Sequence, residues 1–381
     1  MLRLREPKRG KVVVAMSGGV DSSVAAALLV EQGFDCIGVT MQLWPDDLPL
    51  GERGESGCCS LSAVEDARRV AGRLGIPYYV LNFAKDFHEE VIERFVEEYV
   101  VGRTPNPCIT CNERIKFGLL LTRALQLECD YVASGHYART GFDPERNRYV
   151  IAKGADSRKD QSYTLYGLHQ EQLARLLTPL GELPKSRVRE IARELGLINA
   201  DKPDSQEICF VPDNDYKRFL RDVAKDRLNP GAIVDESGVE LGRHEGVAHF
   251  TVGQRHGLGI ASPDGRPRYV VRLDPERREV VVGPLESVLG SALIAERINW
   301  VGRAPMAPGE RQRVQCKIRH HIAPAAGWLE ALADGRAACF FDEPQRAIAP
   351  GQSAVFYDQD DVVAAGGLIA ESQKAAALAT L

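Results

Sequence analysis

A short glycine-rich segment between an apolar run and a helical pattern restricts the fold of this chain most. Lys11–Met16 (KVVVAM) is a continuous apolar run typical of a buried strand, and Ser22–Gln32, rich in Ala and Leu, predicts a helix. The glycines between them allow a sharp turn and a close approach of the backbone to a ligand. Free N–H groups at the helix start, with the hydroxyls of Ser17, Ser22 and Ser23, predict an anion site suited to phosphate.

The first half of the chain alternates strand patterns with helical ones. Further strands are expected at Phe34–Met41, Tyr78–Phe83 and Tyr131–Ser134. Helices are expected between them at Ser60–Leu74, Lys85–Val101 and Lys116–Leu127. This alternation predicts an α/β fold in which helices cover a Rossmann-like parallel sheet.

The pattern changes after about Pro212. A helix is expected at Asp215–Asp226, and short β-type runs separated by Gly, Pro and Asp follow Asn229–Gly231. These runs are Ala232–Asp235, Tyr269–Leu273, Glu279–Val282, Arg313–Ile318, Ala338–Phe341, Ser353–Tyr357 and Val362–Leu368. They predict two small, mainly-β domains after the α/β domain. We place the three domains at residues 1–213, 214–286 and 287–381.

The composition restricts location and partners more than it identifies a function. No apolar run is long enough to span a bilayer, and the opening MLRLREPKRG lacks the apolar core of a secretory signal. Nine cysteines in 381 residues are too sparse for a secreted disulfide scaffold, so we expect a cytoplasmic protein with no membrane partner. With a formal net charge of -5, a nucleic acid would have to be held by local basic patches.

Three cysteines stand where sulfur or metal chemistry is expected. Cys108 and Cys111 form a C-x-x-C in a predicted loop opened by Thr104–Pro107, and Cys209 lies in the distant segment DSQEICF. If they converge, the three thiols would either hold an iron–sulfur cluster or provide a persulfide carrier and a resolving thiol. Structural zinc would need a fourth ligand, for which the adjacent pair Cys58–Cys59 is a poor candidate. Four cysteines in apolar segments are expected to be buried, inert thiols: Cys36, Cys129, Cys316 and Cys339.

Seven segments carry a resemblance to a known family. They are SGGVDSSVAA at Ser17–Ala26, GRTPNPCITCNERIKF at Gly102–Phe117, SGHYAR at Ser134–Arg139, KDQSYTLY at Lys159–Tyr166, DSQEICF at Asp204–Phe210, TVGQRHGLGI at Thr251–Ile260 and PGQSAVFY at Pro350–Tyr357. Together, and in this order, they resemble the bacterial tRNA-specific 2-thiouridylase family over nearly the whole chain. The first is similar to the signature of the PP-loop ATP pyrophosphatase superfamily, whose members activate a carbonyl oxygen as an adenylate and release pyrophosphate.

The resemblance implies an enzyme that uses ATP and magnesium to replace an oxygen of the wobble uridine with sulfur, in the tRNAs for lysine, glutamate and glutamine. ATP contacts are implied for Ala15, Met16, Ser17, Gly18, Gly19, Val20, Asp21, Ser22, Met41 and Gly135. Asp21 is also implied to aid magnesium or phosphate placement. The target base is implied to face Asn106, Pro107 and Cys108. Contacts to tRNA are implied for His136, Lys159, Asp160, Gln161, Arg319, His320 and Gln352.

The thiols include the one departure from the family pattern. Cys111 matches the family's nucleophile and Cys209 its persulfide-bearing cysteine, which a cysteine desulfurase or a sulfur-relay protein loads. Many members have Asp in place of Cys108, assigned as a general acid/base, and a thiol with a pKa of about 8.5 is a poor substitute. The set Cys108, Cys111 and Cys209 resembles that of related enzymes that hold a 4Fe-4S cluster. We therefore expect a cluster here, with a cluster-free persulfide route as the alternative.

Two other classes of protein stay open on the residues alone. An amide-forming ligase of the asparagine, guanylate or NAD synthetase type would share the phosphate loop, but it needs an ammonia source and no cysteine set. An RNA-binding protein with a structural metal at the three cysteines would contain zinc and hydrolyse no ATP. Arg311, Arg313, Lys317 and Arg319 alternate along a predicted strand and share one face, which is either solvated or phosphate-binding.

Overall fold

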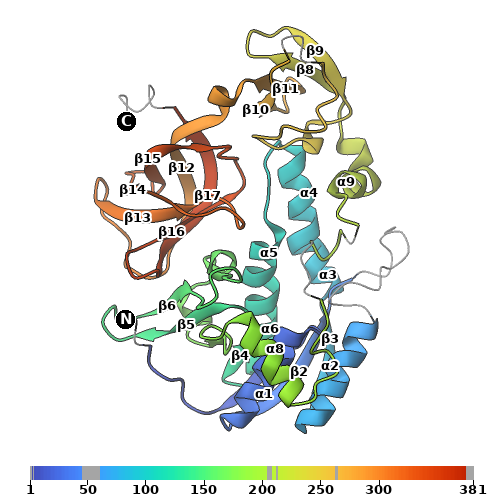
Figure 1. The fold of residues 1–381 in the computed structure, drawn as a ribbon, viewed down its shortest axis with the longest axis vertical. Helices are drawn as coiled ribbons and strands as arrows, with labels where there is room; N and C mark the ends of the chain where they lie inside the picture. Colours follow the sequence, from blue (N-terminus) through green and yellow to red (C-terminus); the bar gives the residue numbers. More distant parts are fainter. Residues whose placement is uncertain are drawn as a thin grey trace.

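The computed structural model describes residues 2, 4–44, 61–203, 208–211, 213–261 and 265–374. Figure 1 shows a parallel sheet with its helices at one end, a small sheet at the other end, and a barrel beside the helices that lie between them. An α/β part followed by two small β parts is the fold class that the sequence predicts, and it is confirmed. No helix in the described ranges is long and apolar enough to cross a membrane.

The first sheet has five parallel strands in the order β3-β2-β1-β4-β7. They are β1 Lys11–Ala15, β2 Asp35–Gln42, β3 Tyr78–Asn82, β4 Tyr131–Ala133 and β7 Leu176–Leu177. Strand β1 is central, and Val12, Val13 and Val14 are at most 1% exposed because helices cover both faces of the sheet. The carboxyl end of β1 therefore lies in the middle of one edge of the sheet.

One face of the sheet is covered by three helices. They are α1 Val20–Glu31, α2 Leu61–Leu74 and α8 Lys185–Glu194. Val12 and Val14 of β1 share an apolar cluster with Val24 of α1, Val70 of α2 and Val188 of α8. Helix α8 comes from a part of the chain far from the other two, and its packing against α1 brings that part to the phosphate loop.

The other face is covered by two composite helices. The first contains α3 Ala84–Phe87, a π-helical segment His88–Ile92 and α4 Glu93–Val100. The second contains α5 Pro107–Thr110, a π-helical segment Cys111–Leu119 and α6 Leu120–Gln126. The helix predicted at Lys85–Val101 is confirmed.

The second composite helix corrects one expectation. The sequence pattern places the helix at Lys116–Leu127 and the C-x-x-C in a loop, whereas the helix begins at Pro107. Proline has the φ angle of a first helical residue, and the side chain of Asn106 caps the helix by accepting a hydrogen bond from Cys108 N. Both cysteines of the motif therefore lie in the first turns of a helix.

Smaller elements complete the α/β part. Strands β5 Ala138–Asp143 and β6 Arg148–Lys153 form an antiparallel hairpin that the sequence pattern does not predict. A 3₁₀ turn Ser162–Leu165 and the short helix α7 Gln170–Leu173 follow it. Arg5 pairs with Phe142 of the hairpin, so the N-terminal segment adds to its edge.

The central part begins with helix α9 Tyr216–Ala224 and the 3₁₀ turn Lys225–Arg227. Its sheet has the order β10-β11-β8-β9. The strands are β8 Gly231–Asp235, β9 Glu240–His244, β10 Tyr269–Asp274 and β11 Glu279–Gly283, with a 3₁₀ turn at Val247–His249. The predicted helix and the predicted strands at β8, β10 and β11 are confirmed, and β9 is an additional strand.

The last part is a closed six-stranded barrel, β12-β15-β14-β13-β16-β17, entered through a 3₁₀ turn at Leu285–Val288. Its strands are β12 Leu289–Trp300, β13 Arg311–Lys317, β14 Ala325–Ala331, β15 Ala337–Arg346, β16 Ser353–Tyr357 and β17 Val363–Gln373. Cys316 and Cys339 are at most 1% exposed in its core. Cys36 and Cys129 are also buried, so the expected burial of these four thiols is confirmed.

Ion pairs and hydrogen bonds hold the barrel against the α/β part. Arg146, in the turn of the β5–β6 hairpin, forms ion pairs with Asp358 at 2.7 Å and Asp360 at 2.8 Å. Tyr163 donates its hydroxyl hydrogen to the carbonyl oxygen of Ser353 at 2.9 Å. The segment KDQSYTLY thus packs on strand β16 of the barrel.

Candidate active site

The glycine-rich segment forms a tight turn from β1 into α1. Gly18 has a φ of +72°, and a Cβ at this position would lie 2.2 Å from the carbonyl oxygen of Ala63. Ser22 Oγ donates to the carbonyl of Gly19 at 3.2 Å and accepts from Ser17 N at 3.1 Å. Gly19 caps α1 and provides no side-chain hydrogen bond to the helix start. The N–H groups there and the positive end of the helix dipole are suited to a phosphate.

Residues from two other strands flank this loop. Met41 lies near the end of β2, and Gly135 follows β4. Gly135 approaches the loop so closely that a Cβ would lie 2.7 Å from Ser22 N. The side chains of Met16 and Val20 are buried, so these two residues can offer a nucleotide only their backbone. The residues with implied ATP contacts therefore meet at one edge of the sheet: Ala15, Met16, Ser17, Gly18, Gly19, Val20, Asp21, Ser22, Met41 and Gly135.

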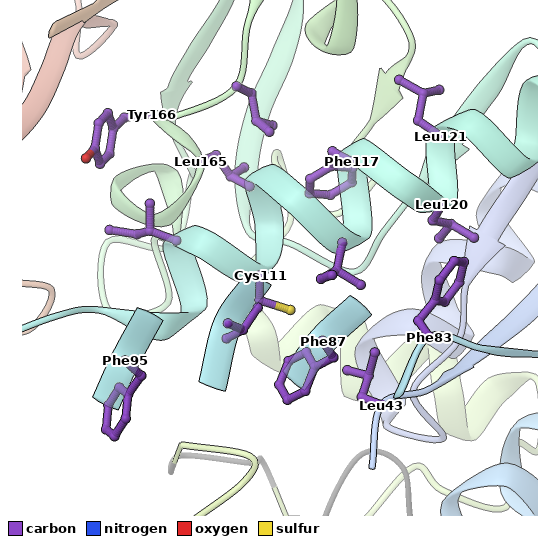
Figure 2. Close-up of a cluster of buried hydrophobic side chains, with 14 of the residues drawn as sticks. Leu43, Phe83, Phe87, Phe95, Cys111, Phe117, Leu120, Leu121, Leu165 and Tyr166 are labelled. Carbon is purple, nitrogen blue, oxygen red and sulfur yellow. The ribbon is translucent and has the colours of Figure 1, made fainter. Parts of the chain in front are cut away.

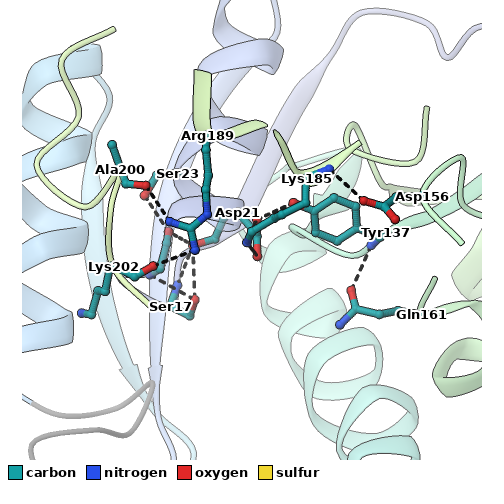
Figure 3. Close-up of polar contacts among 12 residues, drawn as sticks. Ser17, Asp21, Ser23, Tyr137, Asp156, Gln161, Lys185, Arg189, Ala200 and Lys202 are labelled. Carbon is teal, nitrogen blue, oxygen red and sulfur yellow. Dashed lines mark hydrogen bonds and ion pairs between the residues drawn. The ribbon is translucent and has the colours of Figure 1, made fainter. Parts of the chain in front are cut away.

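Three basic side chains that the sequence analysis missed surround the loop (Figure 3). Lys185 and Arg189 belong to α8, and Lys202 follows that helix. Lys202 Nζ lies 3.4 Å from the carbonyl oxygen of Gly18 and pairs with Asp66 at 2.9 Å. The sequence does place Lys185 and Arg189 four residues apart, on one helix face. Nothing local in the sequence indicates which surface that face meets.

Asp21, in the first turn of α1, accepts hydrogen bonds from two side chains (Figure 3). Lys185 Nζ lies 2.7 Å from Oδ1 and 2.8 Å from Oδ2, and the Tyr137 hydroxyl lies 2.6 Å from Oδ1. A carboxylate beside a phosphate loop suits magnesium, whose preferred ligands are oxygen atoms. Because both oxygens of Asp21 already accept from Lys185, magnesium would have to compete with that ammonium group.

Cys111 and Cys209 lie at one apolar cluster between the sheet and the composite helices. Cys111 is 7% exposed and belongs to this cluster, as Figure 2 shows. Cys209 is partly buried and packs against the same cluster, as does Met41 from the nucleotide side. The ring of Phe210, next to Cys209, lies 5.8 Å from that of Phe87. Because α3 also contacts the π-helical segment that begins at Cys111, this helix lies beside both sulfur-transfer candidates.

The three thiols do not form a metal site in this arrangement. Cys108 is exposed, whereas Cys111, in the next turn of the same helix, is buried. Among the described residues, no three His, Cys, Asp or Glu side chains lie close enough together to hold a metal ion. The structure therefore does not support a preformed cluster site at Cys108, Cys111 and Cys209. Cys58 and Cys59 lie outside the described residues.

Family models match the three parts of the chain in turn. The model described as tRNA methyl transferase HUP domain matches residues 10–213. The model described as tRNA methyl transferase PRC-barrel domain matches residues 217–284, and that described as Aminomethyltransferase beta-barrel domain matches residues 290–369.

Full-length relatives decide the family. The chain is 51% identical over 360 residues to the tRNA-specific 2-thiouridylase MnmA of Carboxydothermus hydrogenoformans, covering 94% of this chain and 97% of that protein. It is 54% identical over 361 residues to the protein of the same name from Heliobacterium modesticaldum, covering 94% and 92%. The chain belongs to the tRNA-specific 2-thiouridylase family. A solved 4-thiouridine synthetase–RNA complex with bound ATP shares 18% identity and a TM-score of 0.33, covering 57% of this chain and 51% of that chain, which is too low to carry an argument.

Two residues for which the 2-thiouridylase pattern implies tRNA contacts are buried. His136 is 9% exposed, its Nδ1 lies 2.7 Å from Ser134 Oγ, and burial, with a smaller effect of Lys116, lowers its pKa to about 3. Asp160 is 8% exposed and accepts hydrogen bonds from Ser162 N and Oγ. In this arrangement these two side chains support the fold rather than present a surface to RNA.

Lys159 and Gln161, on either side of the buried Asp160, are partly exposed. Gln161 Oε1 accepts from Tyr137 N at 3.0 Å, which connects the KDQSYTLY segment to the residue that holds Asp21. Lys159 is partly exposed in the adjoining turn, where its backbone N–H donates to the carbonyl oxygen of Asp156 at 3.0 Å.

Arg319, His320 and Gln352 lie where the parts of the molecule meet. Arg319 Nη2 donates to the carbonyl oxygens of Val252 and Ala347, each at 3.1 Å, so it joins the central part to the barrel. Burial, with a smaller effect of His321, lowers the pKa of His320 to about 4. Gln352 Nε2 donates to the carbonyl oxygen of Thr104 at 2.8 Å, in the loop before the base-facing candidates Asn106, Pro107 and Cys108.

The alternating basic residues of β13 do not form one continuous stripe. Arg311 pairs with Glu330 at 2.7 Å, and Arg313 pairs with Asp342. Lys317 is partly buried, and its Nζ lies 5.8 Å from the ring of Tyr163 in the α/β part. Acidic partners on β14 and β15 balance the two exposed arginines, which favours the solvated alternative over a phosphate-binding face.

Proposed function

We propose that this protein catalyses ATP-dependent 2-thiolation of the wobble uridine in the tRNAs for lysine, glutamate and glutamine, with sulfur carried by its own cysteines. One observation carries the proposal: in a chain of this family, helix α3 lies beside both cysteines within one apolar cluster. It contacts the π-helical segment that begins at Cys111, and its Phe87 packs on the ring of Phe210, next to Cys209. An apolar cluster excludes water, and water would otherwise hydrolyse an activated base back to uridine.

The first step in this proposal is activation of the base. The uridine O2 atom is a poor leaving group, so it attacks the α-phosphate of ATP and pyrophosphate leaves. The N–H groups of the turn at Ser17–Ser22 and the start of α1 would stabilise the phosphate charge. Magnesium, with Asp21 as its candidate ligand, would neutralise more of that charge. The base must first leave its stack, which anticodon-loop bases do readily.

The second step is sulfur transfer. The terminal sulfur of a persulfide on Cys209, supplied by a cysteine desulfurase or a sulfur-relay protein, attacks C2 of the base, and AMP leaves. The Cys111 thiolate then attacks the Cys209 sulfur, which releases 2-thiouridine and leaves a bond between the two cysteines. An external thiol reduces that bond before the next turnover. The contacts of α3 with the segment of Cys111 and with Phe210, next to Cys209, support this sequence.

The 4Fe-4S cluster is the second candidate for the sulfur carrier, favoured by the presence of Cys108 in place of the family's Asp. In the described arrangement the three thiols do not form a metal site, so we route no step through a cluster. Anaerobic purification followed by iron and sulfide analysis, with Cys108→Ala as control, separates the two. The cluster route would be established if the protein contains iron, if Cys108→Ala loses that iron, and if the iron-free protein is inactive.

The overall function is tested by reconstitution. Purified protein, ATP, a persulfide donor and unmodified tRNA are incubated, and the digested tRNA is analysed by mass spectrometry for 2-thiouridine. We expect product with ATP and none without it, and at least a hundredfold less with Cys111→Ser or Cys209→Ser. Cys36→Ala is the matched control, because Cys36 is 3% exposed in the cluster on the other face of the sheet. Full activity of both serine variants would contradict the proposal.

A further inference from the structure

Lys185 is a nearly buried cation aimed at the phosphate loop. It is the first residue of α8, and its side chain is 11% exposed. Its ammonium nitrogen lies 2.7 Å and 2.8 Å from the two oxygens of Asp21, whose side chain is 30% exposed (Figure 3). An ammonium group this far from water needs an anion beside it.

The position of Lys185 is fixed from its backbone. Asp156 Oδ2 accepts a hydrogen bond from Lys185 N at 3.1 Å, which anchors the start of α8. Asp156 is 8% exposed, and the hydrogen bond from Lys185 N is the main cause that lowers its pKa, so it is ionised at neutral pH. Helix α8 also packs along α1 through Val188. The hydrogen bond to Asp156 and the packing of α8 on α1 therefore hold the ammonium group beside the loop.

The anion that Lys185 contacts is itself part of the loop. Asp21 lies in the first turn of α1, where a bound nucleotide would place its phosphates. A phosphate there would compete with Asp21 for the ammonium group, and a divalent cation would compete with Lys185 for the carboxylate. The two exchanges compensate each other: the ammonium group of Lys185 gains the phosphate as its anion, and the carboxylate of Asp21 gains the divalent cation.

We propose that Lys185 binds the α-phosphate of the nucleotide, with the Asp21 pair as its state in the absence of ligand. This inference rests on the proposed function for the identity of the nucleotide and adds a phosphate-binding residue to it. The alternative is that Lys185 is only the structural counter-ion of Asp21. The two differ in what the ammonium group recognises: a phosphate in the first case, the protein alone in the second.

The test compares AMP with adenosine, which differ by the α-phosphate alone. Calorimetric titration measures both affinities for the wild type, Lys185→Met and Arg187→Met. Arg187 is the matched control, because it lies on the same helix and is paired at the surface with Glu194. We expect Lys185→Met to lower AMP affinity by about tenfold or more, the size of one charge-assisted hydrogen bond, and to leave adenosine affinity within about twofold. Equal loss of both affinities, or loss of neither, would overturn the inference.

A second pair of variants covers the case in which Lys185→Met folds poorly. Lys185→Met leaves the carboxylate of Asp21 without its ammonium partner, and Asp21→Asn removes that negative charge. Asp21→Asn is therefore compared with Asp21→Asn/Lys185→Met, without magnesium. We expect the single variant to bind AMP at least as tightly as the wild type, and the double variant to lose about tenfold of that affinity. Equal AMP affinity in the two would contradict a phosphate contact.

These titrations are independent of thiolation. If the wild type forms 2-thiouridine but Lys185→Met keeps the preference for AMP over adenosine, the inference fails and the proposed function stands. If Lys185→Met loses the preference but the wild type forms no 2-thiouridine, the phosphate contact stands and the proposed reaction fails.

Discussion

Gly135 shows how a single side chain would close the nucleotide edge. A Cβ at this position would lie 2.7 Å from backbone atoms of Asp21 and Ser22, and backbone cannot move aside as a flexible side chain can. We expect Gly135→Ala to displace the loop and weaken ATP binding by about tenfold or more, with the fold retained. Gly72→Ala is the control, because nothing lies within 4 Å of a Cβ there and alanine favours a helix. Titration with ATP measures both affinities. Unchanged affinity in Gly135→Ala would show that the close approach of Gly135 to the loop has no part in nucleotide binding.

His136 predicts a specific pH dependence of stability. Its pKa is about 3 in the folded protein and about 6.5 when exposed, so the unfolded chain binds the proton more tightly. The stabilisation is fully present above pH 6.5 and is lost as the pH falls toward 3, by about 1.4 kcal/mol per pH unit. We expect His136→Asn to show a shallower loss of unfolding free energy between pH 6.5 and pH 4, measured by urea titration. Parallel curves for the two proteins would show that His136 titrates normally.

Single residues also mark where sequence reasoning succeeds and where it stops. The loop residues from Ser17 to Ser22 could be found because their chemistry depends on neighbours in the chain. Lys185 could not, because its role comes from a contact with Asp21, far away in the sequence. The family resemblance implies a tRNA contact for His136, whereas its position directly after a strand favours a core histidine, and its side chain is buried beside Phe117.

The composite helix that carries the C-x-x-C depends on its first turn. Asn106 caps it through a 3.1 Å hydrogen bond from Cys108 N. We expect Asn106→Ala to cost about 1 kcal/mol of unfolding free energy, and Asn106→Asp, which keeps a capping oxygen, to cost almost nothing. Thermal unfolding of the two variants measures this difference. Equal destabilisation by both would show that the cap contributes little and that Asn106 acts elsewhere.

At the scale of elements, regular patterns were predictable and irregular ones were not. The apolar run at β1 and the amphipathic stretch at Ser60–Leu74 each fit one kind of element, a buried strand and a helix. Both are confirmed, the helix over the described residues Leu61–Leu74. The start of the helix at Pro107 was missed, because prolines at 105 and 107 are equally typical of an extended loop. The hairpin β5–β6 was missed because its strands carry polar residues and gain stability from the barrel and the N-terminal segment.

For the whole molecule, the contact of the hairpin with the barrel is the feature most open to test. Arg146 pairs with Asp358, which is 7% exposed, and also with Asp143 and Asp360. We expect Arg146→Ala to lower stability by about 2 kcal/mol, since it leaves a buried carboxylate unpaired, and to raise the KM for tRNA while ATP affinity stays unchanged. The control is Arg336→Ala, whose ion pairs with Asp334 and Glu371 stay within the barrel.

One outcome for Arg146→Ala would contradict this expectation. A normal KM for tRNA in a protein of reduced stability would show that the barrel orientation has no part in binding RNA. No local pattern predicts this contact, because its partners come from opposite halves of the chain and neither is apolar. The fold class follows from composition and periodicity, whereas the relative placement of its three parts depends on such long-range pairs.

The most direct test of the account follows one sulfur atom. The protein is loaded with an isotopically labelled persulfide and freed of donor, and it is then mixed with tRNA for a single turnover. We predict that the label passes from Cys209 to 2-thiouridine only when ATP is added, and that Cys111→Ser releases no free 2-thiouridine. Labelled nucleoside formed without ATP, or formed at the normal rate by a Cys209→Ser protein, would contradict transfer from the protein's own cysteines to an activated base.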